Sequence, residues 1–173
     1  MTEPKQIEIG DWSTLLDGSE VHILSAGFSR DNEWGLGIKN EKYYEADNTH
    51  FQNPDFTHLV VRVFSEKLEA VYQFHFYNVG AFRVLDEHGM QEIIETLQET
   101  NTYPTLRVRH HGWSKESPLS FHMGTEDGWS YVIMTGWDCV EILSINEPRV
   151  VFESLVEPQE GPLPNPFLDA AKH

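Results

Sequence analysis

Alternating apolar residues in the middle of the chain predict a β-hairpin. In residues 58–64 alternate positions carry Leu or Val, and in residues 68–77 alternate positions carry Tyr or Phe. The polar residues 65–67 lie between the two runs and have the length of a hairpin connection. We therefore predict two antiparallel strands, each with one apolar face.

A change of period after residue 85 predicts a helix over about 87–100. Four apolar residues recur there at helical spacing: Met90, Ile93, Ile94 and Leu97. Asp86 precedes them and can accept hydrogen bonds from the free amides at a helix start. Pro104 prevents the helix from continuing.

Shorter strand patterns surround this middle part. They cover residues 7–9, 21–28, 34–38, 81–85, 105–111, 129–135, 139–145 and 149–156. Short connections favour antiparallel pairing, because parallel strands need a long crossover. The predicted fold class is α+β, with a mainly antiparallel β-sheet and one amphipathic helix packed on it.

The chain length of 173 residues is that of one domain. We predict a single globular domain over residues 1–156. Residues 157–173 contain four prolines and are predicted to form an extended tail. The sequence shows no internal repeat.

The charge balance indicates which partners the chain can bind. Asp and Glu number 28 against 12 Lys and Arg, a formal charge of −16. Such a chain repels nucleic-acid backbones and gains nothing from anionic membrane surfaces. We therefore expect no nucleic-acid partner and no membrane association, and a basic protein is the favoured partner.

The single cysteine, Cys139, excludes an internal disulfide and favours a reducing compartment. The first residues are polar and lack the apolar core of a secretion signal. The expected location is the cytoplasm.

Catalytic motifs do not emerge from the pattern, and we predict no catalytic residue, cofactor or metal site. Cys139 lies in an apolar strand pattern beside Asp138 and Glu141, which does not favour a reactive thiolate. His110 and His111 are adjacent on a predicted strand, so they point to opposite faces and cannot easily share one ion.

A partner-binding surface is predicted in the irregular stretch before the hairpin, where aromatic side chains alternate with acidic ones. Its members are Trp34, Glu41, Tyr43, Tyr44, Glu45 and Asp47. Aromatic anchors with surrounding charge are typical of protein interfaces.

An alternative site is a ligand pocket lined by His75, Arg107, Arg109 and His111. In the predicted strand 105–111, both arginines and His111 share one face. The arginines can equally pair with acidic residues of the same chain, which is the simpler interpretation.

Three function classes follow from these features. The favoured one is an acidic binding module, an inhibitor or immunity-type protein that neutralises a basic partner such as a toxin. Bacterial immunity proteins share this general character, although no family motif is matched here. The second is a small enzyme or ligand-binding domain with an Arg/His-lined pocket. The third is a structural subunit of a larger assembly.

Overall fold

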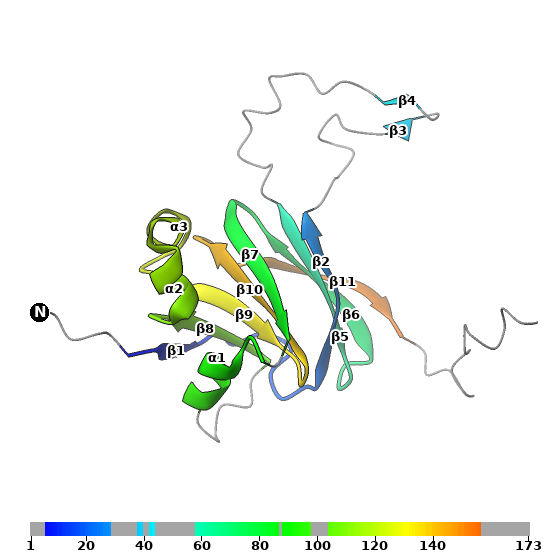
Figure 1. The fold of residues 1–173 in the computed structure, drawn as a ribbon. Coiled ribbons are helices and arrows are strands. Elements are labelled where there is room, and N and C mark those ends of the chain that lie inside the picture. The colour runs from blue at the N-terminus through cyan, green and yellow to red at the C-terminus, as the bar shows by residue number, and fades with distance from the viewer. Residues whose placement is uncertain are drawn as a thin grey trace, which may run out of the picture.

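The protein folds as two antiparallel β-sheets packed face to face (Figure 1). The computed structural model describes residues 6–28, 38–39, 42–43, 58–86, 88–97 and 104–156. Sheet A has the order β1 (Glu8–Asp11), β8 (Thr105–Arg109), β9 (Ser130–Met134), β10 (Asp138–Ser144) and β7 (Val79–Asp86). Sheet B has the order β11 (Arg149–Leu155), β6 (Ala70–Phe76), β5 (Leu59–Ser65) and β2 (Val21–Phe28). A short ribbon pairs β3 (Ile38–Lys39) with β4 (Lys42–Tyr43).

All registered strand pairs are antiparallel, so the predicted α+β class with a mainly antiparallel sheet is confirmed. The predicted hairpin is β5–β6, in register from Leu59 with Phe76 to Ser65 with Ala70. The strands form two sheets rather than one because the chain changes sheet at Tyr77 and Asn78, between β6 and β7.

The main core lies between the two sheets. Every second residue of β5 is fully buried, which is the alternation expected of a strand with one covered face. Trp12, just after β1, packs edge-on against Phe74, Phe76 and Tyr131. The indole thereby joins side chains of both sheets.

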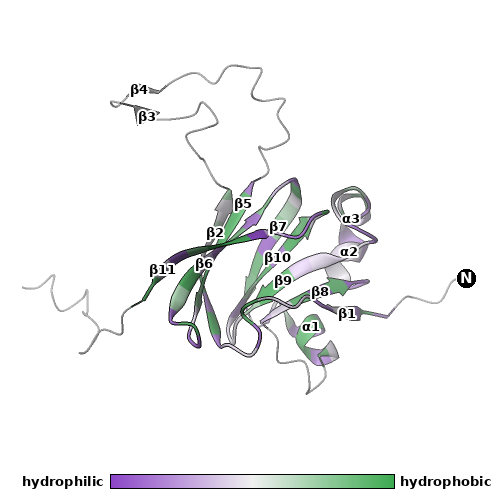
Figure 2. Ribbon diagram, turned by 180° about the vertical axis from the view of Figure 1, so that it is seen from behind, coloured by the Kyte–Doolittle hydropathy of each residue, from purple (hydrophilic) through white to green (hydrophobic). Residues whose placement is uncertain are grey.

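A second apolar cluster lies on the outer face of sheet A, under the helices. Ile93 of α1 (Gln91–Thr96) and Met90, in the turn before α1, pack there with Leu106, Val108 and Cys139. The helices α2 (Gly112–Glu116) and α3 (Pro118–Gly124) cover another part of this face. Figure 2 shows the three helices on the side of sheet A and none over the strands of sheet B. Among the described residues, the outer face of sheet B is therefore open.

The helix α1 is shorter than the predicted 87–100. Helical geometry ends at Leu97, whose ψ of 128° is extended. Ile94 was predicted on the apolar face but is 44% exposed, because so short a helix covers the sheet with only one turn. Asp86 does accept a hydrogen bond, from the amide of Gly89 at 3.0 Å, in the turn that precedes the helix.

The helices α2 and α3 were not predicted. They have five and seven residues, too few for a helical repeat of apolar positions to be recognised. Pro118 stands in the first turn of α3, where proline is well tolerated. The predicted tail, residues 157–173, lies outside the described part of the chain. No helix that the structure describes is long and apolar enough to span a bilayer.

Candidate functional site

The partner-binding surface predicted from the sequence lies almost wholly outside the described residues. This applies to Trp34, Glu41, Tyr44, Glu45 and Asp47. Of Tyr43 the structure describes only the backbone, which pairs with Ile38 in the β3–β4 ribbon. That surface stays a prediction.

Arg107 and Arg109 lie side by side on β8 and flank one indole. Their guanidinium carbons are 5.5 and 4.4 Å from the ring centroid of Trp129. Arg107 lies 3.6 Å from a Glu126 carboxylate oxygen, and Arg109 Nε donates to Glu8 at 2.9 Å. Both arginines are thus engaged by acidic residues of the same chain, which agrees with the simpler interpretation above.

His111 does not share the face of these arginines. His110 has a φ of 65°, in the left-handed region, and β8 ends at Arg109. The backbone turns there, so the strict alternation expected over residues 105–111 stops two residues early. The His111 side chain is fully buried on the opposite, helix-covered face of sheet A, next to Glu141.

Glu141 is the centre of a polar cluster in which the side chains of Glu141 and His111 are fully buried and that of Arg83 is 26% exposed. His111 Nε2 lies 2.7 Å from Glu141 Oε1, Ser130 Oγ donates to the same oxygen at 2.5 Å, and Arg83 Nε donates to Oε2 at 2.8 Å. Burial raises the pKa of the Glu141 carboxyl, but contacts with His111, Arg83 and Ser130 outweigh it, so the pKa is lowered overall. The carboxylate is therefore held in its charged form.

This arrangement is not that of a nucleophilic site. The hydroxyl of Ser130 donates to the Glu141 carboxylate rather than contacting the imidazole of His111, and Ser130 is fully buried, out of reach of a substrate. Trp113 of α2 covers Arg83 with 4.6 Å between the guanidinium carbon and the ring centroid. The cluster joins three strands of sheet A to the segment that starts α2 and thereby holds this segment against the sheet.

His75 lies in a third place, on the open outer face of sheet B. A chain of side-chain contacts crosses this face from strand to strand. In order, its members are Arg62, Glu153, Gln73, His75 and His58. The first contact is an ion pair between Arg62 and Glu153, and it lowers the pKa of Glu153 to about 2 with the help of Gln73.

A shallow groove of about 390 Å³ follows the same face. Arg62, Gln73 and His75 are its polar lining, with Val60 and Phe28 among its apolar members. Of the four residues predicted to form a ligand pocket, His75 alone lines this groove. The structure thus places His75, His111 and the pair of arginines at three separate positions.

Three chain connections meet at one end of the sandwich (Figure 1, lower end). Val21 pairs with Ser65, which places the start of β2 beside the β5–β6 turn. Thr14, in the β1–β2 connection, lies 3.1 Å from Thr105 through their hydroxyls. Thr105 pairs with Ile133, just before the β9–β10 turn.

This end carries several acidic side chains, and Lys67 of the β5–β6 turn lies among them. We call it the acidic end, and its members are Asp17, Glu20, Glu66, Glu69 and Asp138. Trp137, in the β9–β10 turn, stands next to Asp138 and is 71% exposed. An exposed indole is unusual, because tryptophan is highly buried on average.

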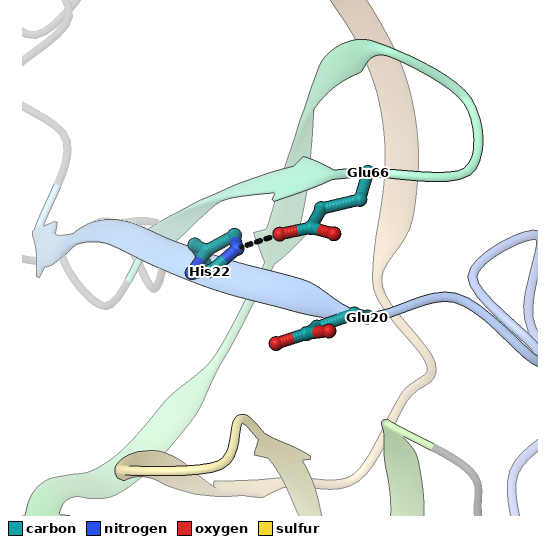
Figure 3. Close-up of side chains that lie close together, drawn as sticks. All are labelled: Glu20, His22 and Glu66. Carbon is teal, nitrogen blue, oxygen red and sulfur yellow. Dashed lines mark hydrogen bonds and ion pairs between the residues drawn. The ribbon is translucent and has the colours of Figure 1, made fainter.

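Within the acidic end, Glu20, His22 and Glu66 converge (Figure 3). His22 Nε2 lies 2.7 Å from Glu66 Oε1, and one donor atom from each residue lies within 4.8 Å of the others. Their side chains project from the start of β2 and from the residue after β5. The sequence analysis did not single out these residues or Trp137.

Comparison with known protein families, with characterised proteins and with solved structures finds no match for this chain. The functional argument therefore rests on the geometry described above.

The available sequence signals for the missed residues were weak. His22 lies in the predicted strand 21–28, but Glu20 precedes that strand, and no pattern in the sequence linked the two. Glu66 could be added only by knowing that β2 pairs with β5, and this register is not readable from one sequence. For Trp137, the signal was its position in a polar turn between two apolar strands.

Proposed function

We propose that this protein is an acidic binding module for a basic protein partner, in the manner of an inhibitor or immunity protein. The observation that carries the proposal is the ion pairing of the arginines in the two sheets. Four of the five arginines in these strands are engaged by a carboxylate of the same chain: Arg62, Arg83, Arg107 and Arg109. The fifth, Arg149, begins β11 and is exposed. The positive charge of the four paired arginines is neutralised locally, and the excess negative charge remains for a partner.

The acidic end fits the physical requirements of such binding. Clustered carboxylates attract a cationic protein over several ångströms at low ionic strength and speed its encounter. The exposed ring of Trp137 offers an apolar anchor beside Asp138, and tryptophan is enriched at energetically important interface positions. Charge would thus promote encounter, and the indole would slow dissociation.

The test uses purified basic nucleases as probes against the full chain. We expect one of them to bind with a defined stoichiometry, and its affinity to fall as salt is raised. Trp137→Ala should weaken binding if the acidic end is the contact surface. Trp34→Ala and Tyr44→Ala should weaken it if the surface predicted from the sequence is used instead.

Leu119→Ala is a matched control, because Leu119 is a similarly exposed apolar residue on α3, 68% exposed, and α3 lies away from the acidic end (Figure 1). Loss of binding in this variant as large as in the others would mean a non-specific apolar contact. No binding of any basic nuclease at low ionic strength would contradict the proposal.

The groove on sheet B supports a second candidate, a small ligand-binding domain. It brings the predicted residue His75 together with Arg62 and Gln73 beside the apolar Val60 and Phe28. Titration of the full chain with small carboxylates, followed by the NMR signal of the His75 ring, tests it. A saturable shift that Arg62→Met abolishes would favour this function, and an unchanged signal would remove it.

A further inference from the structure

We propose that Glu20, His22 and Glu66 form a binding site for a divalent transition metal ion of the Zn²⁺ class. The site shares Glu20 and Glu66 with the acidic end, but the argument for it does not depend on the proposed protein-binding function. It is carried by the convergence of one imidazole and two carboxylates, each with a donor atom within 4.8 Å of the other two (Figure 3).

Backbone geometry, rather than chance contact of long side chains, brings the three residues together. Glu20 immediately precedes β2 and His22 is its second residue, so the two are two apart and point to the same face. The first registered pair of β2 and β5 is Val21 with Ser65, so Glu20 stands opposite Glu66 one step further. The amide of Glu66 donates to the carbonyl of Glu20 at 3.0 Å, which fixes this juxtaposition.

Two carboxylates directly opposite each other on neighbouring strands repel, and such pairs are destabilising. The nearby ammonium group of Lys67 donates to the carbonyl of Asp17 at 3.3 Å. A divalent cation between the carboxylates would convert the repulsion into attraction, and this is the independent reason to expect one.

The donor set selects the class of metal. Imidazole nitrogen suits Zn²⁺ and its neighbours in the first transition row, whereas Ca²⁺ and Mg²⁺ prefer oxygen ligands alone. Three protein ligands with open positions are the pattern of accessible zinc sites. The side chains of His22 and Glu66 are 46% and 49% exposed, so an ion can enter from solvent and keep water in its remaining positions.

The experiment is a calorimetric titration of the chelator-treated full chain with Zn²⁺ alone. We expect one saturable site, and a loss of affinity of at least about tenfold in each of Glu20→Gln, His22→Gln and Glu66→Gln. His88→Gln is the matched control, because His88 is also exposed and pairs with a carboxylate, that of Asp86 at 3.8 Å, but lies outside the group of Glu20, His22 and Glu66. It should bind Zn²⁺ like the unchanged protein.

Thermal unfolding gives a second measurement on the same variants. A ligand that binds only the folded state raises the melting temperature, so Zn²⁺ should raise it in the unchanged protein and in His88→Gln, but not in His22→Gln. Undiminished Zn²⁺ affinity in both Glu20→Gln and His22→Gln would overturn the site. Tighter binding of Ca²⁺ than of Zn²⁺ would overturn the class of metal. Neither result depends on whether a basic protein binds.

Discussion

His111 Nε2 lies 2.7 Å from Glu141 Oε1, and both side chains are completely buried. The pair connects β10 in the middle of sheet A to the residue that precedes α2. Arg83 on the neighbouring strand supplies a cationic partner for the carboxylate. Removing water from charged groups is costly, so the cluster stabilises the fold only while every member has its partner.

The first prediction concerns the carboxylate at the centre of this cluster. Glu141→Gln keeps the side-chain volume but leaves Arg83 without a counter-charge in a covered position, so we expect the free energy of unfolding to fall by about 3–5 kcal/mol. Urea denaturation followed by fluorescence measures it. Glu153→Gln is the control, because it removes a carboxylate that pairs with Arg62 on the open face, and its loss should be much smaller. Equal losses would contradict the assignment of a structural role to the buried cluster.

The second prediction is the loss of stability in acid. The pKa values of Glu141 and Glu153 are both lowered in the folded protein, and the second falls from 4.5 to about 2. A carboxyl with a depressed folded pKa contributes stability that is complete above its unfolded pKa and is lost as pH falls through the folded pKa. Stability should therefore decline between about pH 4.5 and pH 2.

Urea denaturation at a series of pH values tests this window, with Glu153→Gln as the matched variant. The variant lacks one of the two titrating groups, so its stability should fall less steeply with acid than that of the unchanged protein. If the free energy of unfolding fell equally steeply with pH in both proteins, the ion pair of Glu153 with Arg62 would contribute nothing to folding.

The β5–β6 hairpin could be predicted because its signals are local. Apolar residues at alternate positions and a three-residue polar connection report on a strand pair without knowledge of the remaining chain. The division into two sheets is not local, since β6 pairs with β5 while β7, only two residues later, pairs with β10. The spacing of apolar residues along the chain does not indicate which strand β7 pairs with.

The candidate sites show the same limit. Arg83 and Glu141 are 58 residues apart, and His22 and Glu66 are 44 apart, so only the strand register brings them together. His111 was placed on the wrong face because the alternation rule assumes extended backbone, and the positive φ of His110 interrupts it. Sequence reasoning anticipated the internal pairing of Arg107 and Arg109, since acidic partners are abundant in this chain.

The third prediction is that Cys139 is chemically inert in the folded protein. Burial raises the pKa of its thiol to about 12, and the nearby charge of Glu141 adds to the effect. Thiolate is the reactive form, so a thiol-specific reagent at neutral pH should not label the native chain. In urea the same cysteine should react completely. Rapid labelling without urea would show that the strand β10 opens far more often than its burial implies.

The fourth prediction tests the close approach of β7 and α3. A Cβ atom added at Gly80 would lie 3.3 Å from the Cα of Gly124, a backbone atom that cannot rotate away. Gly80→Ala must therefore push α3 away from sheet A, and we expect a loss of about 1–3 kcal/mol in the free energy of unfolding. Gly136→Ala is the control, because nothing lies within 4 Å of its added Cβ. Urea denaturation of both variants separates crowding at this contact from the general effect of replacing glycine. Equal stability of Gly80→Ala and Gly136→Ala would show that α3 does not pack closely on the sheet.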